Sequence, residues 1–323
     1  MKAVYIYPKS SFATELRSDT LWGLIIMAIG YVWSEQKLIE IINSFLYGET
    51  PFVLSSAFPF RKNSEGEIQH YLPRPFLKPM LNIKDDEIID KRKKTKSIKF
   101  VIKPIFEKII NGEVDEKELI DFLYNNLDNL DFAIDPIKVS NLHTTIDPMT
   151  GTTLELEGRG QLFFTYEFFF HKNYEGLFFL IDGDDLSFID PALRFLTHFG
   201  IGADHSIGKG HFDFEIKDFS FRLPENPNSF VTLSLYTPTE DELNTFIQNK
   251  GNLYYELVQR KGIIGSQFKK KAFEKKPFFA FSEGSRFPAV VPKKYLGRII
   301  KTMDEPPAFS YSFAFPIPAR FKE

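Results

Sequence analysis

The 323-residue chain contains no cysteine, so it forms neither a disulfide nor a cysteine-ligated zinc site. The absence of cysteine is typical of a reducing compartment, and we expect the cytoplasm. There is no run of about 18 or more apolar residues, and the N-terminus passes directly into a strand pattern. We therefore expect no membrane span and no signal peptide. The formal net charge is only −3, which excludes a polycation, so any nucleic-acid site must come from local basic clusters.

Aromatic residues, in contrast, are abundant, with 36 Phe and 13 Tyr, and apolar residues make up 43% of the chain. A chain of this length and apolar content can bury the core of one large domain or two ordinary ones. The strongest local signal is a stretch that contains Gly200, Gly202, Gly208 and Gly210.

The glycine-rich stretch connects a predicted helix to a predicted strand. Upstream, Asp190 can cap a helix that begins at Pro191, and apolar side chains recur at helical spacing up to Phe199. Gly200 suits the left-handed residue that ends such a helix. Downstream, apolar and polar residues alternate over 211–217, as in a half-buried strand. The polar side chains of the loop and its end are His205, Ser206, Lys209 and His211.

Two interpretations of this loop remain open. It does not fit a Walker loop, because five residues separate Gly202 from Gly208 and a glycine follows Lys209. It does not fit a dinucleotide fingerprint either, since that motif follows a strand and opens a helix. The loop is either a flexible turn or a segment whose glycines let the backbone approach a nucleic-acid phosphate closely.

Near the N-terminus, Ser18 is placed to cap a helix whose apolar residues recur at helical spacing. Asp19 then lies at the positive end of the helix dipole, and we favour this role for Asp19 over a catalytic one. Arg17, just before the helix, is a candidate for phosphate contact.

Two stretches are strongly basic. Residues 91–103 contain seven basic residues and no acidic one, and they include Lys93, Lys94 and Lys96. Residues 260–276, which include Lys270, are opposed only by Glu274, and Phe268 and Phe273 are interleaved. Basic groups with interleaved aromatics are typical of a groove for single-stranded nucleic acid, although each run is also consistent with a solvated segment. The following segment offers a hydroxyl, a guanidinium and a ring at Ser285, Arg286 and Phe287.

Two extended arms surround a turn in the middle of the chain. The arms are residues 137–145 and 162–170, the turn is 147–151, and a glycine-flanked Arg159 interrupts the return arm. This pattern predicts a long, projecting hairpin.

The order of elements predicts two ferredoxin-like βαββαβ units in tandem, an α+β fold. The first unit is residues 1–218, with the basic segment 91–103 and the hairpin as insertions. The second is residues 223–323, joined near 218–229. In the second unit we expect strands at 230–236, 253–258, 278–281 and 309–317. We expect helices after the capping box at Thr239 and at 292–301.

These pieces together resemble the RAMP-superfamily subunit of type III-A CRISPR (Csm) complexes that caps the guide RNA 5′ end, the fourth subunit of that complex. The matching segments are residues 18–23, 54–60, 72–75, the hairpin, the glycine loop, 284–287 and the closing Phe-rich strand. The resemblance implies binding to the 5′ handle of the crRNA, with a thumb that bends the RNA at the handle–guide junction. It implies no catalysis, no cofactor and no membrane. It also implies three partners, which are the large polymerase-like subunit, the backbone RAMP subunit and, indirectly, target RNA.

The loop departs from the family at one place. Where the family often has Lys-Arg-Ser-Ser, this chain has Ala203, Asp204, His205 and Ser206. Backbone N–H groups and Lys209 are therefore the favoured phosphate contacts. The full set of expected RNA-binding residues is Arg17, Ser18, Lys93, Lys94, Lys96, Arg159, Gly200, Gly202, His205, Ser206, Gly208, Lys209, Gly210, Lys270, Ser285, Arg286 and Phe287.

Three other functions remain as alternatives. Endoribonucleases of the same superfamily commonly use a histidine near the first helix as general base, and here no histidine precedes His70. The metal-dependent backbone subunit uses an aspartate, for which Asp19 or Asp147 would serve, but neither has an acidic partner at metal-site spacing. No two histidines form a ligand pair on one helix face, although His198, His205 and His211 are close in sequence, and we expect no metal. The third alternative is a freestanding RNA-binding protein.

Overall fold

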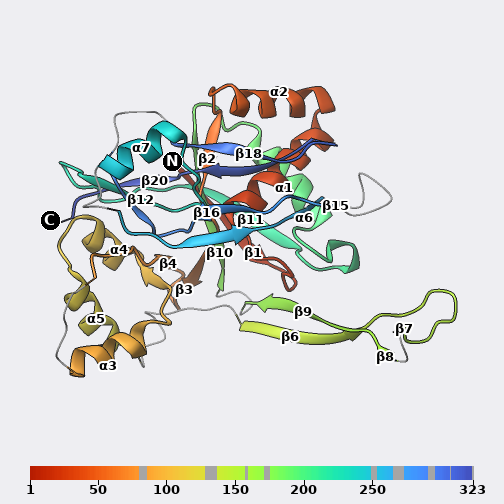
Figure 1. The fold of residues 1–323 in the computed structure, drawn as a ribbon, viewed down its shortest axis with the longest axis horizontal. Coiled ribbons are helices and arrows are strands. Elements are labelled where there is room, and N and C mark those ends of the chain that lie inside the picture. The colour runs from red at the N-terminus through yellow and green to blue at the C-terminus, as the bar shows by residue number, and fades with distance from the viewer. Residues whose placement is uncertain are drawn as a thin grey trace.

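The computed structural model describes residues 1–79, 86–127, 137–156, 159–170, 175–248, 253–264, 273–289, 295–305 and 307–321. Its body contains several separate sheets, the largest with seven strands and the next with three, and a long hairpin projects from it (Figure 1). The described residues therefore do not form one continuous sheet, which agrees with the prediction of two tandem units. Within the described residues, no helix combines the length and the apolar character that crossing a membrane requires.

The first sheet has seven strands, with β11 (Phe212–Asp218), β1 (Lys2–Pro8), β10 (Glu175–Gly183) and β3 (Phe58–Lys62) side by side. All these neighbours are antiparallel. With α1 (Ser18–Val32) after β1 and α6 (Ile189–Phe199) after β10, this is the ferredoxin-like strand order, which confirms the prediction for the first unit. The sheet continues through β4 (Ile68–Pro73) and β5 (Phe100–Ile102), and β2 (Phe52–Leu54) also pairs with β10.

The core explains why these segments take these forms. Strands β1 and β10 are almost continuously apolar and buried, because neighbours and helices cover both of their faces. Helices α1 and α6 contact each other and turn their apolar stripes into the same core. Helix α6 begins at Ile189, so the predicted cap Asp190 instead lies in its first turn and forms an ion pair with Arg194.

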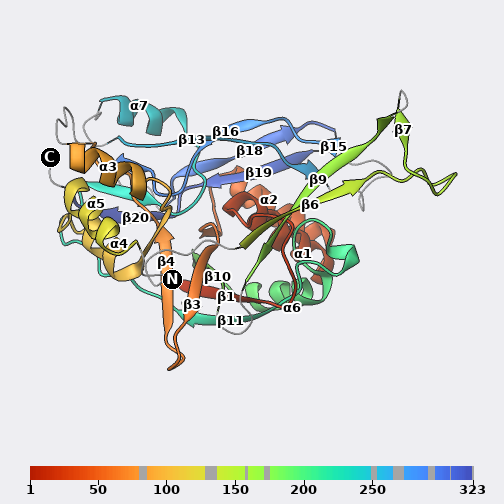
Figure 2. The ribbon, with the colours of Figure 1, turned by 90° about the horizontal axis from the view of Figure 1, so that it is seen from below.

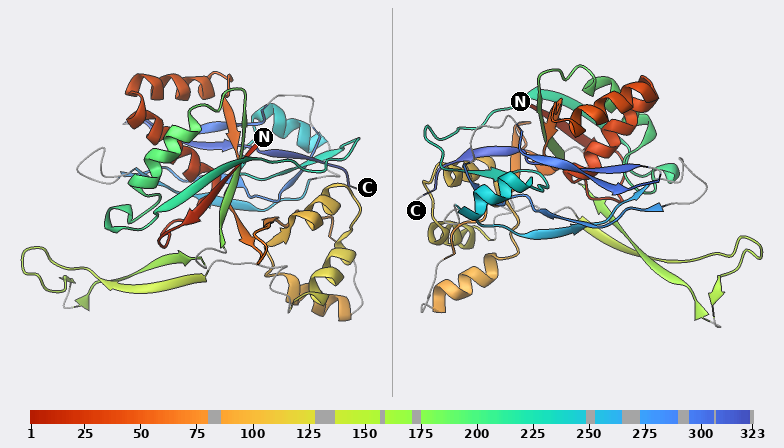
Figure 3. Two further views of the ribbon diagram at one scale, coloured as in Figure 1. Left: turned by 180° about the vertical axis from the view of Figure 1, so that it is seen from behind. Right: turned by 45° about the horizontal axis from the view of Figure 1, so that its top comes forward.

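Several elements are inserted into this unit. Helix α2 (Glu35–Leu46) follows α1, and α3 (Asp86–Thr95), α4 (Lys103–Ile110) and α5 (Glu116–Asn125) form a cluster at one end. Strands β6 (Ile137–Thr144) and β9 (Leu162–Phe169) pair antiparallel along their whole length, which confirms the predicted hairpin. We call the hairpin, with its short strands β7 (Glu155–Leu156) and β8 (Arg159–Gly160), the thumb (Figure 2). The thumb and the α3–α5 cluster lie on the side of the body opposite to α2 (Figure 3).

In the second unit, β12 (Ser229–Thr232) lies between β17 (Arg286–Pro288) and β20 (Pro316–Ala319). Strand β13 (Leu257–Arg260) pairs with β16 (Phe278–Phe281), and a bridge between Tyr254 and Arg286 continues this pairing onto β17. The strand order of a second ferredoxin-like unit is thus present. Helix α7 (Glu240–Gln248) begins with the predicted capping box, in which Thr239 and Glu242 bond reciprocally.

The helix predicted at 292–301 is wrong. Within that range the structure describes residues from Tyr295 on, and Gly297–Met303 forms strand β18, which pairs with β19 (Ala308–Phe313). The apolar spacing of this segment is compatible with either form, and the hairpin prevails because Gly297–Met303 pairs with β19, with a bulge between Lys301 and Met303, and buries Ile299 and Thr302. The predicted last strand is divided into β19 and β20, because Phe315 N donates to Ser234 Oγ at 2.7 Å between them. A further small pair is β14 (Ile263–Ile264) with β15 (Phe273–Glu274).

The two units share one core. The main cluster of buried apolar residues includes Trp22 of α1 and Tyr311 of β19, whose rings stack with their centroids 6.1 Å apart. The buried Tyr311 hydroxyl accepts a 3.0 Å hydrogen bond from the Leu54 N–H. The chain crosses from the first sheet to the second between Asp218 and Ser229, while the domain boundaries proposed from the sequence stay predictions.

Candidate nucleic-acid interface

The glycine loop connects α6 to β11 and lies against the segment that follows β1. Ala203 N donates to Thr14 Oγ1 at 2.8 Å, Gly210 N donates to Ser11 O at 2.9 Å, and His211 N donates to Ser10 Oγ at 3.0 Å. These contacts hold the loop near its start, at Ala203, and at its end, at Gly210 and His211. The loop is therefore a built element of the fold.

All four glycines of the loop have positive φ, between 72° and 92°, and so does Asp204 at 62°. A Cβ at Gly210 would lie 2.0 Å from Ile201 O, and one at Gly202 would lie 2.9 Å from Thr14 Oγ1. Packing thus explains these two glycines. Gly208 differs, because a Cβ there would meet no atom within 4 Å. Its surroundings are open, so a ligand has room to approach the backbone at this position.

Most N–H groups of the loop are already bonded within the protein. Those of Ile201, Ile207, Gly208 and Lys209 donate to carbonyl oxygens of the loop itself. In the described part of the chain, the N–H groups of Gly202, Asp204, His205 and Ser206 have no acceptor. The prediction that backbone N–H groups of the loop donate to phosphate therefore applies to these four groups, which lie beside the open position Gly208.

Lys209 is held by two carboxylates. Its Nζ atom lies 2.9 Å from Asp204 Oδ2 and 3.1 Å from Glu167 Oε1 on β9. Hydrogen bonding to Asp204, and secondarily to Glu167, raises the pKa of Lys209. Its side chain is only 16% exposed, so Lys209, one of the predicted phosphate contacts, links the loop to the thumb within the protein.

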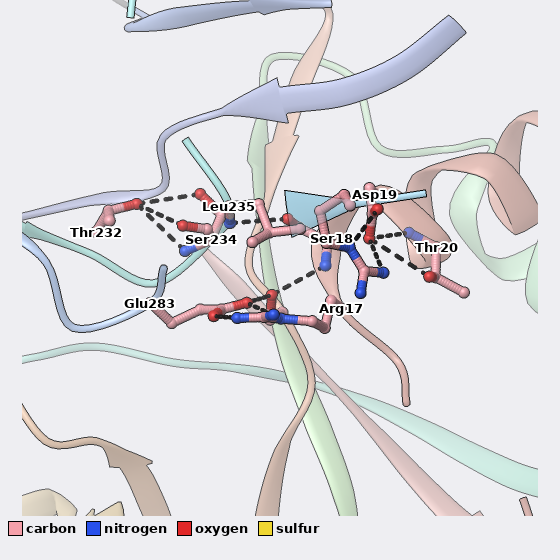
Figure 4. Close-up of polar contacts among 10 residues, drawn as sticks. Arg17, Ser18, Asp19, Thr20, Thr232, Ser234, Leu235 and Glu283 are labelled. Atoms are coloured by element: carbon pink, nitrogen blue, oxygen red, sulfur yellow. Dashed lines mark hydrogen bonds and ion pairs between the residues drawn. The ribbon is translucent and has the colours of Figure 1, made fainter. Parts of the chain in front are cut away.

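Arg17, Ser18 and Asp19 contact three different segments of the second unit (Figure 4). Arg17 forms an ion pair with Glu283, and its Nε atom lies 3.1 Å from Glu283 Oε1. Ser18 Oγ accepts a 3.0 Å hydrogen bond from Leu235 N. We call these contacts the interdomain joint. Ser18 is fully buried and does not cap α1, whose N-cap is Arg17 without a side-chain bond, so the capping prediction is wrong.

Asp19 completes the joint. Its Oδ2 and Oδ1 atoms accept from Arg260 Nε and Nη2 at 2.9 Å and 3.0 Å, and Oδ1 also accepts from Thr20 N at 2.8 Å. Asp19 lies in the first turn of α1, as the preferred interpretation expected. The bidentate pair with Arg260 adds a structural role that the sequence did not indicate, because Arg260 lies far along the chain.

Ser285, Arg286 and Phe287 lie inside the second unit. Ser285 and Phe287 are fully buried, and Arg286 is 2% exposed. The Arg286 guanidinium lies over the Phe321 ring, 3.7 Å from its centroid, and burial lowers the pKa of Arg286 to about 10. These residues therefore pack the core, and their burial opposes the predicted contact with RNA.

The two basic runs differ in how far their charges are paired. In the first run, Lys94 pairs with Asp90 at 2.7 Å, whereas Lys93 and Lys96 are exposed and have no ion pair among the described residues. In the second run, Lys261 and Lys276 pair with Glu274 and Asp304. Lys270 lies outside the described residues. Arg159 lies on β8, and its side chain is likewise outside the described part.

The sequence analysis missed the apolar surface of the thumb. Cross-strand partners share a face, so the pairings Leu142–Phe164, Ser140–Tyr166 and Thr144–Leu162 bring four large apolar side chains together. All four are exposed, from 49% at Tyr166 to 65% at Leu162. The sequence did contain a signal for this surface, because apolar residues of β9 lie on both alternating faces of the strand. A strand with one solvated face usually carries polar residues on that face.

Metal binding finds no support in the described residues, where no three His, Asp or Glu side chains are grouped to hold an ion. His205 stacks on Phe199, and His211 Nδ1 lies 3.3 Å from Thr197 O.

The family model of the RAMP superfamily matches residues 16–213, and that of the CRISPR Csm4 C-terminal domain matches residues 225–319. The curated relative "CRISPR system Cms protein Csm4" of Thermococcus onnurineus (strain NA1) is 26% identical over 262 residues, which cover 77% of this chain and 79% of the relative.

Solved structures show the same fold. A Csm1–Csm4 cassette in complex with cA4 matches with a TM-score of 0.65 and 20% identity, over 100% of this chain and 98% of that chain. The Csm3–Csm4 subcomplex of a type III-A CRISPR-Cas interference complex also matches with a TM-score of 0.65, at 18% identity, over 99% and 100% of the two chains.

Proposed function

Because the chain belongs to the RAMP superfamily and carries a Csm4 C-terminal domain, we propose that it binds the 5′ repeat-derived handle of the crRNA in a type III-A effector complex. In this role it is a non-catalytic subunit that joins the large polymerase-like subunit to the backbone RAMP filament. The related solved structures are assemblies of Csm4 with Csm1 and with Csm3, which supports these two kinds of partner. Target RNA is contacted indirectly, through the guide.

The glycine loop carries this proposal. Four N–H groups without an acceptor lie beside the open position Gly208, on a loop whose ends are fixed by the core. Backbone N–H groups that donate to phosphate oxygens position an RNA strand without reading its bases. A handle that must be held in the same place in every complex, whatever guide follows it, suits such contacts.

The thumb supports the second part of the proposal, a bend in the RNA at the handle–guide junction. It is rooted beside the glycine loop, because Lys209 of the loop pairs with Glu167 of β9. Its outer face carries the exposed rings Phe164 and Tyr166. Apolar and aromatic side chains wedge between bases or stack on them, so a thumb with this face can interrupt a continuous base stack.

Two features of the candidate catalytic residues support the proposal that the chain is not catalytic. Asp19, the residue with the best claim to an acid or metal role, has both carboxylate oxygens bonded to Arg260. The missing early histidine removes the general base that a repeat-processing relative would use.

The proposal is tested by the RNA that the assembled complex retains. The full chain is co-expressed with its large and backbone subunits and a repeat–spacer array, and the 5′ ends of the bound RNA are sequenced. We expect one fixed repeat-derived handle at the 5′ end of every species, with variable sequence after it. Heterogeneous 5′ ends, or recovery of the chain without partners and with unrelated RNA, would contradict the proposal and favour a freestanding RNA-binding protein.

A further inference from the structure

Four aromatic rings lie against one another in a cluster that ends in the glycine loop. The Tyr31 ring of α1 stacks on Phe195 of α6 at 5.2 Å between centroids, with 15° between planes. Phe195 stacks on Phe199 at 5.4 Å and 22°, and Tyr31 also lies 6.2 Å from Phe199, so these three rings form a triangle. Phe199 in turn stacks on His205 at 4.5 Å and 25°. We call these four residues the ring cluster. His205 is its last member, and its ring is held nearly parallel to the ring of Phe199.

The local structure explains this order. Phe195 and Phe199 are four residues apart on α6, and side chains with that spacing lie above one another on one face of a helix. Gly200 then ends the helix with positive φ, and the left-handed Asp204 turns the chain back so that His205 meets Phe199. A substituent on Gly200 would lie 3.0 Å from the His205 Cβ, so the close return of the loop depends on glycine there.

The ring cluster lies at the surface of the protein. Tyr31 is 53% exposed, and Phe195, Phe199 and His205 are each partly exposed. Ser206 and Gly208, which lie near His205 in the loop, are exposed as well. Among the described residues, the His205 ring contacts the Phe199 ring, and no second ring covers it. A partly exposed imidazole that stacks on Phe199 offers a flat surface for one further ring.

We propose that His205 stacks on one unpaired base of the bound RNA, on the face of its ring that Phe199 does not cover. This inference rests on the proposed function and assigns the loop a base contact in addition to its backbone contacts. Single-stranded RNA is commonly held by stacking of splayed bases on aromatic and histidine side chains, and every base has a face that can stack. The contact therefore secures one nucleotide without selecting its identity strongly.

The polar groups beside the ring favour RNA over a protein partner. The N–H groups of His205 and Ser206, and those of Gly202 and Asp204, have no acceptor in the described part of the chain. A nucleotide supplies both a ring for the imidazole and phosphate oxygens for these donors. An apolar protein surface laid over the same place would bury the donors without acceptors, which costs about 1–3 kcal/mol per group.

The experiment uses the full chain and a single-stranded handle RNA in which 2-aminopurine replaces one base at a time. In the parent protein, we expect the fluorescence of one position to be quenched on binding. His205→Ala is expected to abolish that quenching and to weaken binding roughly 5- to 100-fold, the range for loss of one stacked base. His205→Phe keeps an aromatic ring and is expected to restore both. The slope of affinity against salt stays unchanged in both variants, because stacking neutralises no phosphate.

Ile207→Ala is the matched control, since Ile207 is a 72% exposed neighbour in the same loop and carries no ring. It should bind RNA like the parent. If the parent binds handle RNA but His205→Ala binds equally well and quenching persists, this inference is overturned while the proposed function stands. The inference is also overturned if His205→Ala and His205→Phe weaken RNA binding equally. It is likewise overturned if His205→Ala binds RNA like the parent but no longer binds a partner subunit. If the parent does not bind handle RNA at all, the proposed function itself fails.

Discussion

Lys209 Nζ lies 3.1 Å from Oε1 of Glu167 and so ties the glycine loop to the root of the thumb. Glu167 also accepts hydrogen bonds from Ser11 Oγ at 2.6 Å and from Asn141 Nδ2 at 2.7 Å. One carboxylate thus joins the loop, both strands of the thumb and the segment that follows β1. This carboxylate, together with the backbone bridge between Phe12 and Phe168, holds the root of the thumb beside the loop.

We expect Glu167→Gln to loosen this junction. The amide keeps part of the hydrogen bonding but loses the charge that faces Lys209. The free energy of unfolding should fall by about 1–3 kcal/mol, the usual cost of an unmatched buried polar group. Thermal unfolding followed by circular dichroism measures this change. Glu40→Gln, in an exposed ion pair on α2, is the control and should change stability by less than about 0.5 kcal/mol. If the two substitutions lower the free energy of unfolding equally, Glu167 does not join the loop to the thumb in the way described.

The first basic run should contribute electrostatic affinity through Lys93 and Lys96. Each phosphate contact to a single strand adds about 0.7 to the slope of log affinity against log salt. The double substitution Lys93→Ala, Lys96→Ala should therefore flatten the slope by about 1.4. Adding Lys94→Ala should change it by less than about 0.7, because Lys94 already faces Asp90. Filter binding of handle RNA over a salt series measures the slope, and an unchanged slope in the triple variant would make this run a solvated segment.

We expect no RNA cleavage by the purified chain, with or without Mg²⁺. The reason is that both carboxylate oxygens of Asp19 already accept hydrogen bonds from Arg260. Asp19→Ala should leave RNA turnover at zero but lower the thermal midpoint, because it leaves a partly buried guanidinium without its carboxylate. Gel analysis of labelled repeat RNA is the measurement. Cleavage by the parent that survives purification and disappears in Asp19→Ala would instead make this residue catalytic.

Stability should depend on pH through His70. Burial, and secondarily the nearby Lys103, lowers the pKa of His70 to about 4, and its Nε2 atom lies 2.8 Å from the Tyr5 hydroxyl. The unfolded chain takes up this proton near pH 6.5, whereas the folded chain does so only near pH 4. Stability contributed by the neutral ring is therefore complete above pH 6.5 and is lost as the pH falls to 4, by about 3 kcal/mol.

His70→Gln removes this titration. Thermal midpoints measured from pH 7 to pH 4 should fall less steeply in this variant than in the parent. Parallel curves for the two proteins would contradict the assignment of this pH dependence to His70.

Local signals predicted the glycine loop and the thumb well. Positive φ at Gly200, Gly202, Gly208 and Gly210 follows from a preference of glycine itself, so the sequence alone indicates it. The arms of the thumb pair along one continuous register, and alternating extended residues are again a local pattern.

Distant contacts explain what could not be predicted. Ser18 is predicted as a helix cap from the sequence, yet it lies inside α1 and its hydroxyl accepts a hydrogen bond from Leu235 N in the other unit. Lys209 looks like a free cation until the fold brings Glu167 beside it. Part of the helix predicted at 292–301 becomes strand β18, because it pairs with β19, the next strand along the chain. For Ser18 and Lys209 the partner lies far along the chain, and no local pattern reports it.

The central claim is that the backbone of the glycine loop, and not its lysine, holds the handle RNA. Gly208→Val places a branched side chain in the open space beside the unpaired N–H groups, at φ +92°, which strains any residue with a Cβ. We expect it to weaken handle binding about tenfold or more, equivalent to loss of one charge-assisted hydrogen bond. Lys209→Ala should weaken binding less, because its charge is already neutralised within the protein.

The direct test is the affinity of both variants for handle RNA at one fixed salt concentration, after circular dichroism confirms that each is folded. Gly48→Val is the matched control, since Gly48 also has positive φ, at +84°, and open space around it but lies at the end of α2. It should carry a similar strain and bind RNA like the parent. The account predicts that Gly208→Val loses more affinity than Lys209→Ala. A folded Gly208→Val that binds like the parent, while Lys209→Ala does not, would contradict it.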